Sequence, residues 1–467
     1  MNNNLLRKIP KTDVLLAVPA LRDACGRFPY ELVKSTAQAC TDGIRTAMLS
    51  GELDSVPDAA EIARQVIEKL ELGDIYSLKR VINATGIVLH TNLGRAPLGK
   101  EIAQHVAEVA AGYCNLEYDI DAGCRGSRYS HIEKLLCSLT GAEAAMVVNN
   151  NAGAVFLMLN TLCSGQKVAV SRGELVEIGG SFRVPEIMNQ SGAELMEIGT
   201  TNKTHPSDYV KALENGAAAL LKVHTSNFVM QGFTESVEIE ELGSIAREKG
   251  ALTLYDLGSG FLFPSENLGI QDLGHVAGKC LRAGADVVCF SGDKLLGSAQ
   301  AGILIGRREL IERIKKNHLT RMLRIDKLSL AALEMSLRYS VDPALAKEKI
   351  PALYMLSKTE KECMSAAREL EALIKTSAPG CEARATHTQD EAGGGSLPGV
   401  MLDGAAVSLS IEGLSPQELE KKLRLRSVPI ICRISRESVL ISVRTLGEGD
   451  GEEISKAIGE IAGEARA

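Results

Sequence analysis

The chain has 467 residues, enough for two or three domains, with the 45% hydrophobic and 24% charged content of an ordinary globular protein. It has no apolar run long enough to span a membrane and no apolar signal core at its N-terminus, which predicts a cytoplasmic protein without a membrane segment. The net charge of −7 argues against indiscriminate nucleic-acid binding but leaves room for a local basic patch. Eleven scattered cysteines without a Cys-x-x-Cys pair predict buried, reduced thiols, with no disulfide framework and no metal site.

Residues 1–78 are predicted to form a small helical module. Apolar residues over 14–21 recur at helical spacing, with a break expected at Pro19, and residues 61–70 form a more regular amphipathic pattern. Residues 1–45 carry seven basic and four acidic side chains, a net charge of +3 against the sign of the whole chain.

Residues 79–345 are predicted to form an α/β catalytic domain, because short apolar runs alternate with helical stretches. The expected strands are 144–148, 167–170, 194–198, 219–223, 252–255, 287–290 and 302–306. This alternation is typical of a mainly parallel sheet covered by helices on both faces. Ligands of such sheets bind beyond the carboxyl ends of the strands.

Residues 346–467 are predicted to form a small α+β domain. A long helical region at 326–378 leads into a glycine-rich loop at 393–399. Strand-like alternation then follows at 405–409 and 439–443, and helices are expected at 415–424 and 451–465.

Lys294 follows the apolar strand 287–290, and Asp256 follows the strand 252–255. Burial disfavours the charged form of a lysine, so such a side chain is either paired in a structural ion pair or used as an amine. A strand-end acid followed by a strand-end lysine favours the second interpretation, with pyridoxal phosphate as cofactor. Lys294 would form the Schiff base, Asp256 would keep the pyridinium nitrogen protonated, and the Ser291 hydroxyl would bind the cofactor phosphate.

Two further segments are candidate cofactor contacts. Asn151, Ala152 and Gly153 open a helix after the strand 144–148, where backbone amides and the helix dipole favour an anion; a plain capped helix start is the alternative. His224 and Ser226 follow another strand, and one of these polar groups could hydrogen-bond the cofactor's ring oxygen; a satisfied loop histidine is the alternative.

Arginines form a third group of candidates. Arg95 and the loop 125–128 place arginines beside glycines, and the segment 307–327, which contains Arg321 and Arg324, has eight basic and three acidic residues, a net charge of +5. Arginine forks match phosphate oxygens, so these residues would form an anion-attracting mouth if the fold brings them together. Solvated loops and a solvated helix face are the alternative.

Several long blocks resemble one known family. They are residues 82–98 (INATGIVLHTNLGRAPL), 115–129, 171–183 (SRGELVEIGGSFR) and 199–204 (GTTNKT), together with 9–16 and the loop GGGSLPG at 393–399. In this order they resemble the bacterial selenocysteine synthases, the L-seryl-tRNA(Sec) selenium transferases, over nearly the whole chain. One departure is Ser298-Ala299-Gln300-Ala301-Gly302, where the family usually has Gly-Pro-Gln-Ala-Gly.

The resemblance implies a fold-type I pyridoxal phosphate enzyme that converts L-seryl-tRNA(Sec) to L-selenocysteinyl-tRNA(Sec), with selenophosphate as donor. Lys294 falls on the family's Schiff-base lysine, and Arg95, Arg321 and Arg324 fall on arginines of the selenophosphate side of the pocket. The N-terminal module falls on the part that recognises the tRNA. The family also forms homo-oligomers, rings of dimers with active sites at subunit interfaces.

The implied reaction is a dehydration followed by an addition. Lys294 would take the serine α-proton, loss of water would give an aminoacrylyl intermediate, and selenium from selenophosphate would add to it. One alternative is a pyridoxal phosphate lyase or eliminase of a small amino acid or amino sugar phosphate, which would not need the N-terminal module. Another is a tRNA-binding scaffold with an inactive site, in which loss of the lysine or the aspartate would be expected.

Overall fold

The computed structural model describes residues 6–51, 53–71, 77–179, 182–270 and 276–466. Gly180 and Ser181 of the third family-like block and the first five residues of the chain lie outside them. The chain divides into two compact units, Met1–Ile82 with Lys421–Ile430, and Asn83–Glu420 with Ile431–Ala467. None of the helices in the described part is both long and apolar enough to cross a membrane.

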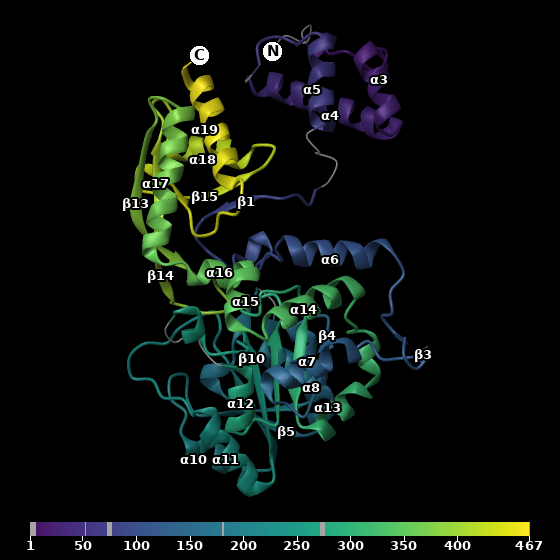
Figure 1. The fold of residues 1–467 in the computed structure, drawn as a ribbon, viewed down its shortest axis with the longest axis vertical. Helices are drawn as coiled ribbons and strands as arrows, with labels where there is room; N and C mark the ends of the chain where they lie inside the picture. The colour runs from purple at the N-terminus through teal and green to yellow at the C-terminus, as the bar shows by residue number, and fades with distance from the viewer. Residues whose placement is uncertain (1–5, 52, 72–76, 180–181, 271–275, 467) are drawn as a thin grey trace. The chain divides into compact units, whose positions relative to one another are not determined.

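The first unit contains a helical cluster (Figure 1). Its helices are α2 (Thr12–Leu16), α3 (Pro19–Arg27), α4 (Tyr30–Ser50) and α5 (Ala59–Glu71). The expected break at Pro19 is confirmed, because this proline opens α3, where a helix has no acceptor for the missing N–H. Leu15, Leu21, Val33 and Ile62 meet in a buried apolar core.

A seven-stranded sheet dominates the second unit, in the order β4-β12-β11-β10-β9-β5-β8. The strands are β4 (Ala144–Val148), β5 (Lys167–Ser171), β8 (Glu194–Ile198), β9 (Ala217–Val223), β10 (Leu252–Gly258), β11 (Val287–Ser291) and β12 (Gly302–Gly306). Only β12 is antiparallel to its neighbours within this sheet, so the expected mainly parallel sheet is confirmed. The carboxyl ends of the six other strands therefore share one edge.

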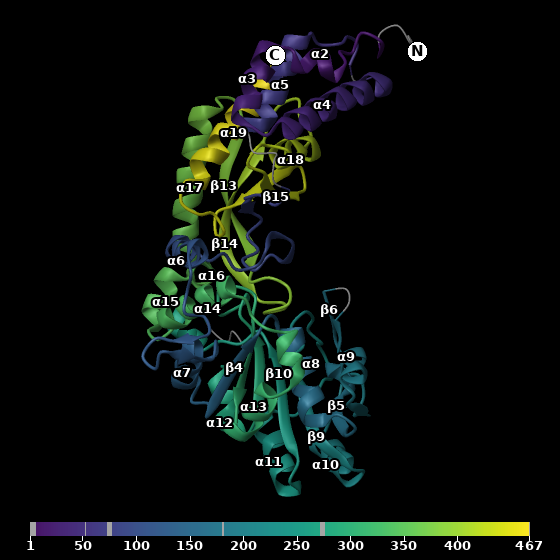
Figure 2. The ribbon, with the colours of Figure 1, turned by 90° about the vertical axis from the view of Figure 1, so that its right-hand side faces the viewer.

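Helices cover both faces of this sheet (Figures 1 and 2). One face packs against α8 (Asn151–Cys163), α9 (Val184–Ser191) and α13 (Arg308–Lys315). The other packs against α7 (Ser130–Thr140), α10 (Pro206–Glu214), α11 (Ile239–Lys249), α12 (Ala277–Ala283) and α14 (Lys327–Tyr339). Every residue of β4, β11 and β12 is buried, which explains their continuous apolar sequences.

The chain then forms a five-stranded sheet in the order β1-β15-β16-β14-β13. Its strands are β1 (Ile82–Ala84), β13 (Glu382–Glu391), β14 (Met401–Ser410), β15 (Ile430–Ser435) and β16 (Ser438–Ser442), and α17 (Glu360–Ser377), α18 (Pro416–Arg424) and α19 (Asp450–Arg466) accompany them. β13 and β14 pair over ten residues and carry the glycine-rich loop between them. Figure 2 shows this loop at the end of the hairpin that reaches the large sheet.

Two expectations for the C-terminal part need correction. The helical region expected at 326–378 is divided among α14, α15 (Pro343–Lys349), α16 (Pro351–Ser357) and α17, because Pro343 and Pro351 each start a new helix. β13 and β15 were not anticipated. The sequence of β13 is mostly polar and its burial does not alternate, so it lacks the period-two signal of a half-buried strand.

Candidate active site

Asp256 lies at the carboxyl end of β10, with 3% of its surface exposed. Asn151 Nδ2 donates a hydrogen bond of 2.8 Å to its Oδ1 atom, and the Gly258 amide donates one of 3.1 Å to the same oxygen. Burial raises the pKa of Asp256, while the Asn151 hydrogen bond and the nearby charge of Lys294 oppose that rise. The carboxylate is thus oriented by two donors but short of a full counter-charge.

Lys294 follows β11 and has 7% of its surface exposed. Burial lowers the pKa of its ammonium group; Asp256 opposes this effect and the positive charge of Arg95 adds to it. The glycine-rich loop closes over the amine, since a Cβ atom on Gly395 would lie 3.8 Å from Lys294 Nζ. The structure therefore gives Lys294 the environment of a reactive amine and brings it into the electrostatic field of Asp256.

The start of α8 adjoins this pair. Asn150 caps the helix by accepting a hydrogen bond of 2.8 Å from the Gly153 amide, so that amide is already engaged. The first amides of a helix lack intrahelical acceptors, which makes those of Asn151 and Ala152 the natural donors to a phosphate. Gly302 is required beside them, because a Cβ atom there would overlap the Asn150 carbonyl.

The remaining predicted cofactor contacts lie along the same sheet edge. The His224 amide donates to the Asp256 carbonyl at 2.9 Å, and the Ser226 amide donates to the His224 carbonyl at 2.8 Å. Ser291 is the buried last residue of β11, three positions before Lys294. The ends of β4, β9, β10 and β11 thus bring all the predicted cofactor residues to one region.

Buried polar atoms in this region lack partners among the described residues. They are Asn149 Oδ1, Asn151 Oδ1, Ser226 Oγ and Ser259 Oγ. A buried polar group without a hydrogen bond is costly, by about 1–3 kcal/mol. Four such atoms around Asp256 and Lys294 fit a polar ligand that would complete their hydrogen bonds.

Arg95 lies beside the lysine turn. Its Nη1 atom is 2.6 Å from Asp293 Oδ2, and its backbone is left-handed with a φ of 61°. A cavity of about 290 Å³ opens here, lined by Arg95, Asp293, Ser298 and Gln300 among others. Ser298, at the departure from the family pattern, is buried and its amide donates to the Gly292 carbonyl at 2.9 Å.

Arg324 lies next to the start of α8, because it pairs with Val148 in an isolated β-bridge. Its Nη1 atom is 3.2 Å from Glu117 Oε1. Val148 pairs with β12 on its other side, so the backbone of Arg324 lies three strand spacings, or about 14 Å, from that of β11. Arg321 is exposed at the end of a short 3-10 helix, η4 (His318–Arg321).

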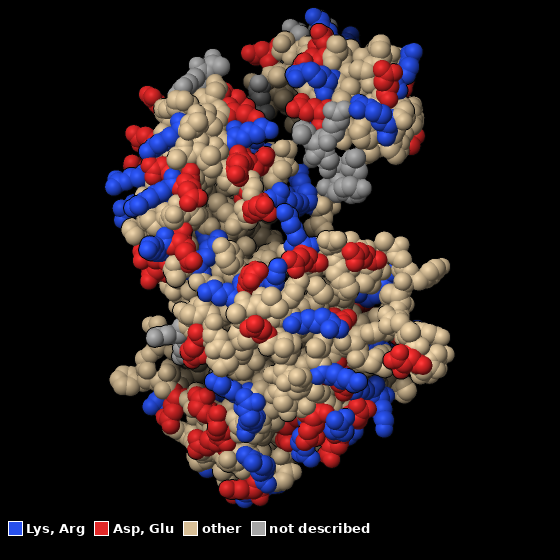
Figure 3. Space-filling model, in the orientation of Figure 1, with Lys and Arg blue, Asp and Glu red and all other residues tan. Residues whose placement is uncertain are grey.

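Acidic partners offset much of the basic segment 307–327. Arg307 binds Asp286 at 3.0 Å, and Lys315 binds Glu133 at 2.7 Å. Basic and acidic side chains are also interspersed over the face of the molecule in Figure 3. The segment is accordingly not a continuous basic surface, and Arg324 is the arginine of this segment that the bridge with Val148 brings next to α8.

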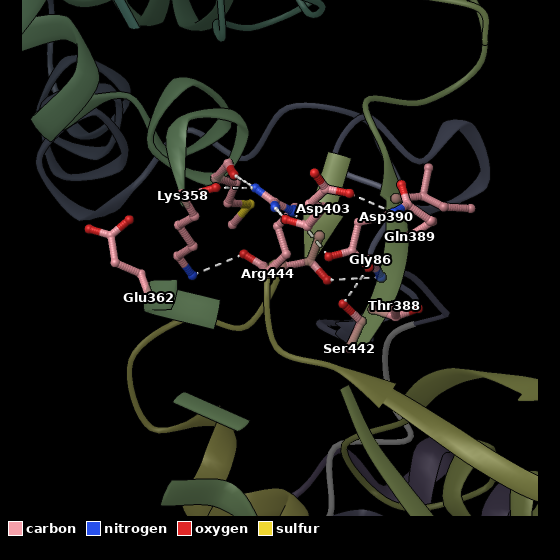
Figure 4. A network of polar contacts seen from close by, with 12 residues as sticks. Gly86, Lys358, Glu362, Thr388, Gln389, Asp390, Asp403, Ser442 and Arg444 are labelled. Carbon is pink, nitrogen blue, oxygen red and sulfur yellow. Dashed lines mark hydrogen bonds and ion pairs between the residues drawn. The ribbon is translucent and has the colours of Figure 1, made fainter. Parts of the chain in front are cut away.

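An unpredicted polar network anchors the loops of the site (Figure 4). Asp390 and Arg444 are 0% and 1% exposed, and Arg444 Nε donates to Asp390 Oδ2 at 3.0 Å. Arg444 also donates to the carbonyls of Met355 and Lys358, each at 2.9 Å. Ser442 Oγ completes the network by donating to Asp390 Oδ1 at 2.9 Å.

This network holds two segments that reach Lys294. Gly86 packs directly on Asp390, where any Cβ atom would overlap the carboxylate. The Val88 amide then donates to the Glu391 carbonyl at 3.0 Å, which ties the segment leading to Arg95 to the end of β13. The only sequence signal for this cluster was an arginine directly after an apolar strand.

Comparisons with known proteins agree with these observations. The family described as L-seryl-tRNA selenium transferase matches residues 81–447, and the selenocysteine synthase N-terminal family matches residues 6–45. The chain is 46% identical over 462 residues to the L-seryl-tRNA(Sec) selenium transferase of Geobacter metallireducens, covering 98% of this chain and 99% of that protein. It is 45% identical over 458 residues to the enzyme of the same name from Aquifex aeolicus, with the same coverage.

A solved structure shares the fold. The structure of D-glucosaminate-6-phosphate ammonia-lyase aligns with a TM-score of 0.58 and 21% identity, covering 86% of this chain and 99% of that one. At this identity the likeness concerns the fold alone.

Proposed function

The chain belongs to the L-seryl-tRNA selenium transferase family, and we propose that it converts L-seryl-tRNA(Sec) to L-selenocysteinyl-tRNA(Sec) with pyridoxal phosphate as its cofactor. The observation that supports this most directly is that Lys294, whose pKa is lowered by burial, and Asp256, which Asn151 orients, are both buried at the same sheet edge. The sequence matches to this family include the N-terminal helices as well as the large sheet. This favours a tRNA substrate over the alternative of a small-molecule lyase, which would not need the N-terminal module.

The residues present fit pyridoxal phosphate in three ways. Lys294 would supply the amine, Asp256 would supply an acid for the ring nitrogen, and the amides of Asn151 and Ala152 at the start of α8 would bind the phosphate. When bound, this cofactor stores the electron pair that remains when a proton leaves the amino acid α-carbon. The unpartnered atoms Asn151 Oδ1 and Ser226 Oγ would gain hydrogen bonds in that arrangement.

Each side chain then has a defined task. Lys294, whose pKa is lowered by burial, would remove the serine α-proton and later return a proton to the same carbon. A cationic ring nitrogen beside Asp256 would oppose the rise that burial causes in the pKa of that carboxyl group and would favour its ionised form. Gly395 lies against the buried Lys294 amine, and this contact would limit the access of water to the amine.

We propose selenophosphate as the second substrate. An anionic donor would bind in the cavity beside Arg95, and the charges of Arg321 and Arg324 would add to its attraction. Asp293 already neutralises part of the charge of Arg95, so Arg95 alone would attract the phosphate of the donor weakly. We therefore propose that all three arginines together attract this phosphate. We also propose that the enzyme acts in the cytoplasm.

We also propose a homo-oligomer, a ring of dimers. The exposed aromatic side chains of Tyr113 and Tyr118 lie in the segment 112–129 of the second unit and support contacts with further copies. The division into a tRNA-recognition module at 1–78, a catalytic domain at 79–345 and a C-terminal domain at 346–467 likewise remains a proposal.

The test uses the absorbance of the lysine-bound cofactor. The wild-type protein should show a band that borohydride reduction removes and that shifts on addition of seryl-tRNA(Sec). Lys294→Ala should lack the band, whereas Lys279→Ala, at an exposed position on α12, should retain it. A band that persists in Lys294→Ala would refute the assignment, and a band that responds to free amino acids but not to the charged tRNA would favour the lyase.

A further inference from the structure

A second cavity lies beside the cofactor region, on the side away from the arginines. It has a volume of about 480 Å³ and is lined by the ends of β5 and β9, the turn after β8 and the glycine-rich loop. His224 and Thr225 form its border with the cofactor region, because the His224 amide binds the Asp256 carbonyl. In the strand order, this cleft extends over β9, β5 and β8, while Lys294 and Arg324 lie over β11 and β4.

We propose that this cleft binds the 3′-terminal nucleoside of the charged tRNA, the adenosine that carries the seryl ester. The proposal rests on the proposed function. In the substrate, the serine α-carbon and the ribose are three bonds apart, about 4 Å. The nucleoside must therefore occupy space that directly adjoins Lys294.

The cleft meets that requirement of distance. Leu397 and Pro398 line it, and they belong to the same short loop as Gly395, which closes over Lys294. A ribose at the border formed by His224 and Thr225 would hold its ester at the lysine and place its base in the cleft. The volume is also sufficient for a nucleoside, since small-ligand pockets start at about 300 Å³.

The charges that line the cleft favour a neutral ligand over a phosphate. Lys222 is buried and already has two partners, because its Nζ atom donates to Glu174 Oε1 at 3.2 Å and to the Val237 carbonyl at 2.7 Å. Lys203 is the other lining cation, and the lining acids are Glu174, Glu235 and Glu238. A phosphate would meet a site with more acids than cations, whereas a base and a ribose carry no charge.

Several other lining side chains suit a nucleobase. Phe228 is half-buried, packs against the sheet core and lines the cleft, where its ring would stack on a base, and Val229 and Met230 line the cleft as well. The hydroxyls of Thr201, Thr225 and Thr234 provide donors and acceptors for the ribose and the base edge. The two substrates would thus approach Lys294 from opposite sides, the anionic donor past the arginines and the uncharged nucleoside through this cleft.

The test compares two serine derivatives on the cofactor-loaded protein. One is 3′-(L-serylamino)-3′-deoxyadenosine, a stable analogue of the charged tRNA end, and the other is L-serine methyl ester, which lacks the nucleoside. Calorimetry gives both affinities, and the cofactor absorbance reports engagement of the α-amine. We expect Phe228→Ala to weaken binding of the nucleoside analogue about tenfold and to leave the methyl ester unchanged.

Two further variants control for folding and location. Phe228→Tyr keeps the aromatic face and should retain wild-type affinity for the analogue. Phe233→Ala removes a ring from the same segment, 90% exposed and outside the cleft lining, and should also behave as wild type.

Three results would overturn the proposal. If Phe228→Ala weakened the binding of both probes equally, the substitution would act on the site around Lys294, which both probes share, and not on a nucleoside site. If Phe228→Ala bound the analogue with wild-type affinity, Phe228 would not contact the nucleoside. A change in the sedimentation of Phe228→Ala with unchanged probe binding would assign the cleft to a contact with a second copy. The two proposals can fail independently. If the proposed function is wrong, the wild-type protein shows no cofactor band, whereas calorimetry still measures binding of the nucleoside analogue to the cleft.

Discussion

Arg95 Nη1 lies 2.6 Å from Asp293 Oδ2, and Asp293 immediately precedes Lys294. This ion pair joins a loop of the segment that follows β1 to the turn after β11, more than 190 positions later in the chain. Arg95 adopts the left-handed backbone conformation, which is unfavourable for a residue other than glycine and is often retained at functional sites. The pair therefore places a positive charge at a fixed position near the reactive amine.

Replacement of Arg95 should change the titration of Lys294. The positive charge of Arg95 lowers the pKa of Lys294, so Arg95→Gln should raise it, and Asp293, released from its partner, acts in the same direction. A higher pKa leaves less neutral amine at any pH below it. The rate at which the cofactor-free protein captures pyridoxal phosphate should then reach its plateau at higher pH than in wild type. A profile that is unchanged or displaced to lower pH would contradict the assigned coupling.

Asn151 should control the ionisation of Asp256. Its hydrogen bond lowers the pKa of that carboxyl group, so Asn151→Ala should raise the pKa and move the acidic limb of the activity profile to higher pH. Loss of a hydrogen bond to a charged group costs about 1.5–3 kcal/mol, which corresponds to a decrease of about 10- to 140-fold in cofactor affinity. Fluorescence titration with pyridoxal phosphate measures this loss.

A matched control lies on the same helix. Asn160 Nδ2 donates to the Ser191 carbonyl at 3.0 Å, away from the site, so Asn160→Ala should keep the wild-type pH profile. Equal displacement of both profiles would show that the effect of Asn151→Ala comes from the helix as a whole.

The Asp390–Arg444 pair should matter mainly for stability. Asp390→Asn keeps the size of the side chain but leaves the guanidinium of Arg444 buried without its counter-charge, which costs about 3–5 kcal/mol. Urea denaturation should show this decrease in the free energy of unfolding. Glu448→Gln breaks the exposed pair with Lys100 and should leave the unfolding midpoint unchanged. Similar midpoints for the two variants would show that Asp390 is not the anchor that the contacts indicate.

The placement of Asp256 and Lys294 at one sheet edge could be predicted from the sequence, because the carboxyl ends of parallel strands coincide. The contact between Asn151 and Asp256 could not. It depends on β12 and β11 lying between β4 and β10, and the apolar pattern of a buried strand does not specify its neighbours. The same reasoning applies to Arg324, whose approach to α8 depends on a bridge with Val148.

The Asp390–Arg444 network escaped prediction for a different reason. Asp390 belongs to β13, whose polar sequence carries no strand signal, and its partner lies 54 positions later in the chain. Isolated charged residues are usually exposed, so nothing local indicates that these two are buried. Only the pairing of β13 with β14, and of β14 with β16, brings them together.

Gly404 provides a steric test of the same network. It lies on β14 opposite Thr388, and a Cβ atom there would overlap the Asp390 carboxylate, so Gly404→Ala must displace a buried charged pair. We expect a loss of about 1–3 kcal/mol in the free energy of unfolding, as for other overpacked cores. Gly463→Ala is the matched control, because nothing lies within 4 Å of its Cβ position and alanine stabilises the interior of α19 by up to about 1 kcal/mol. Equal unfolding midpoints for the two variants would mean that the Asp390 carboxylate moves aside without cost, which its contacts with Ser442 and Arg444 oppose.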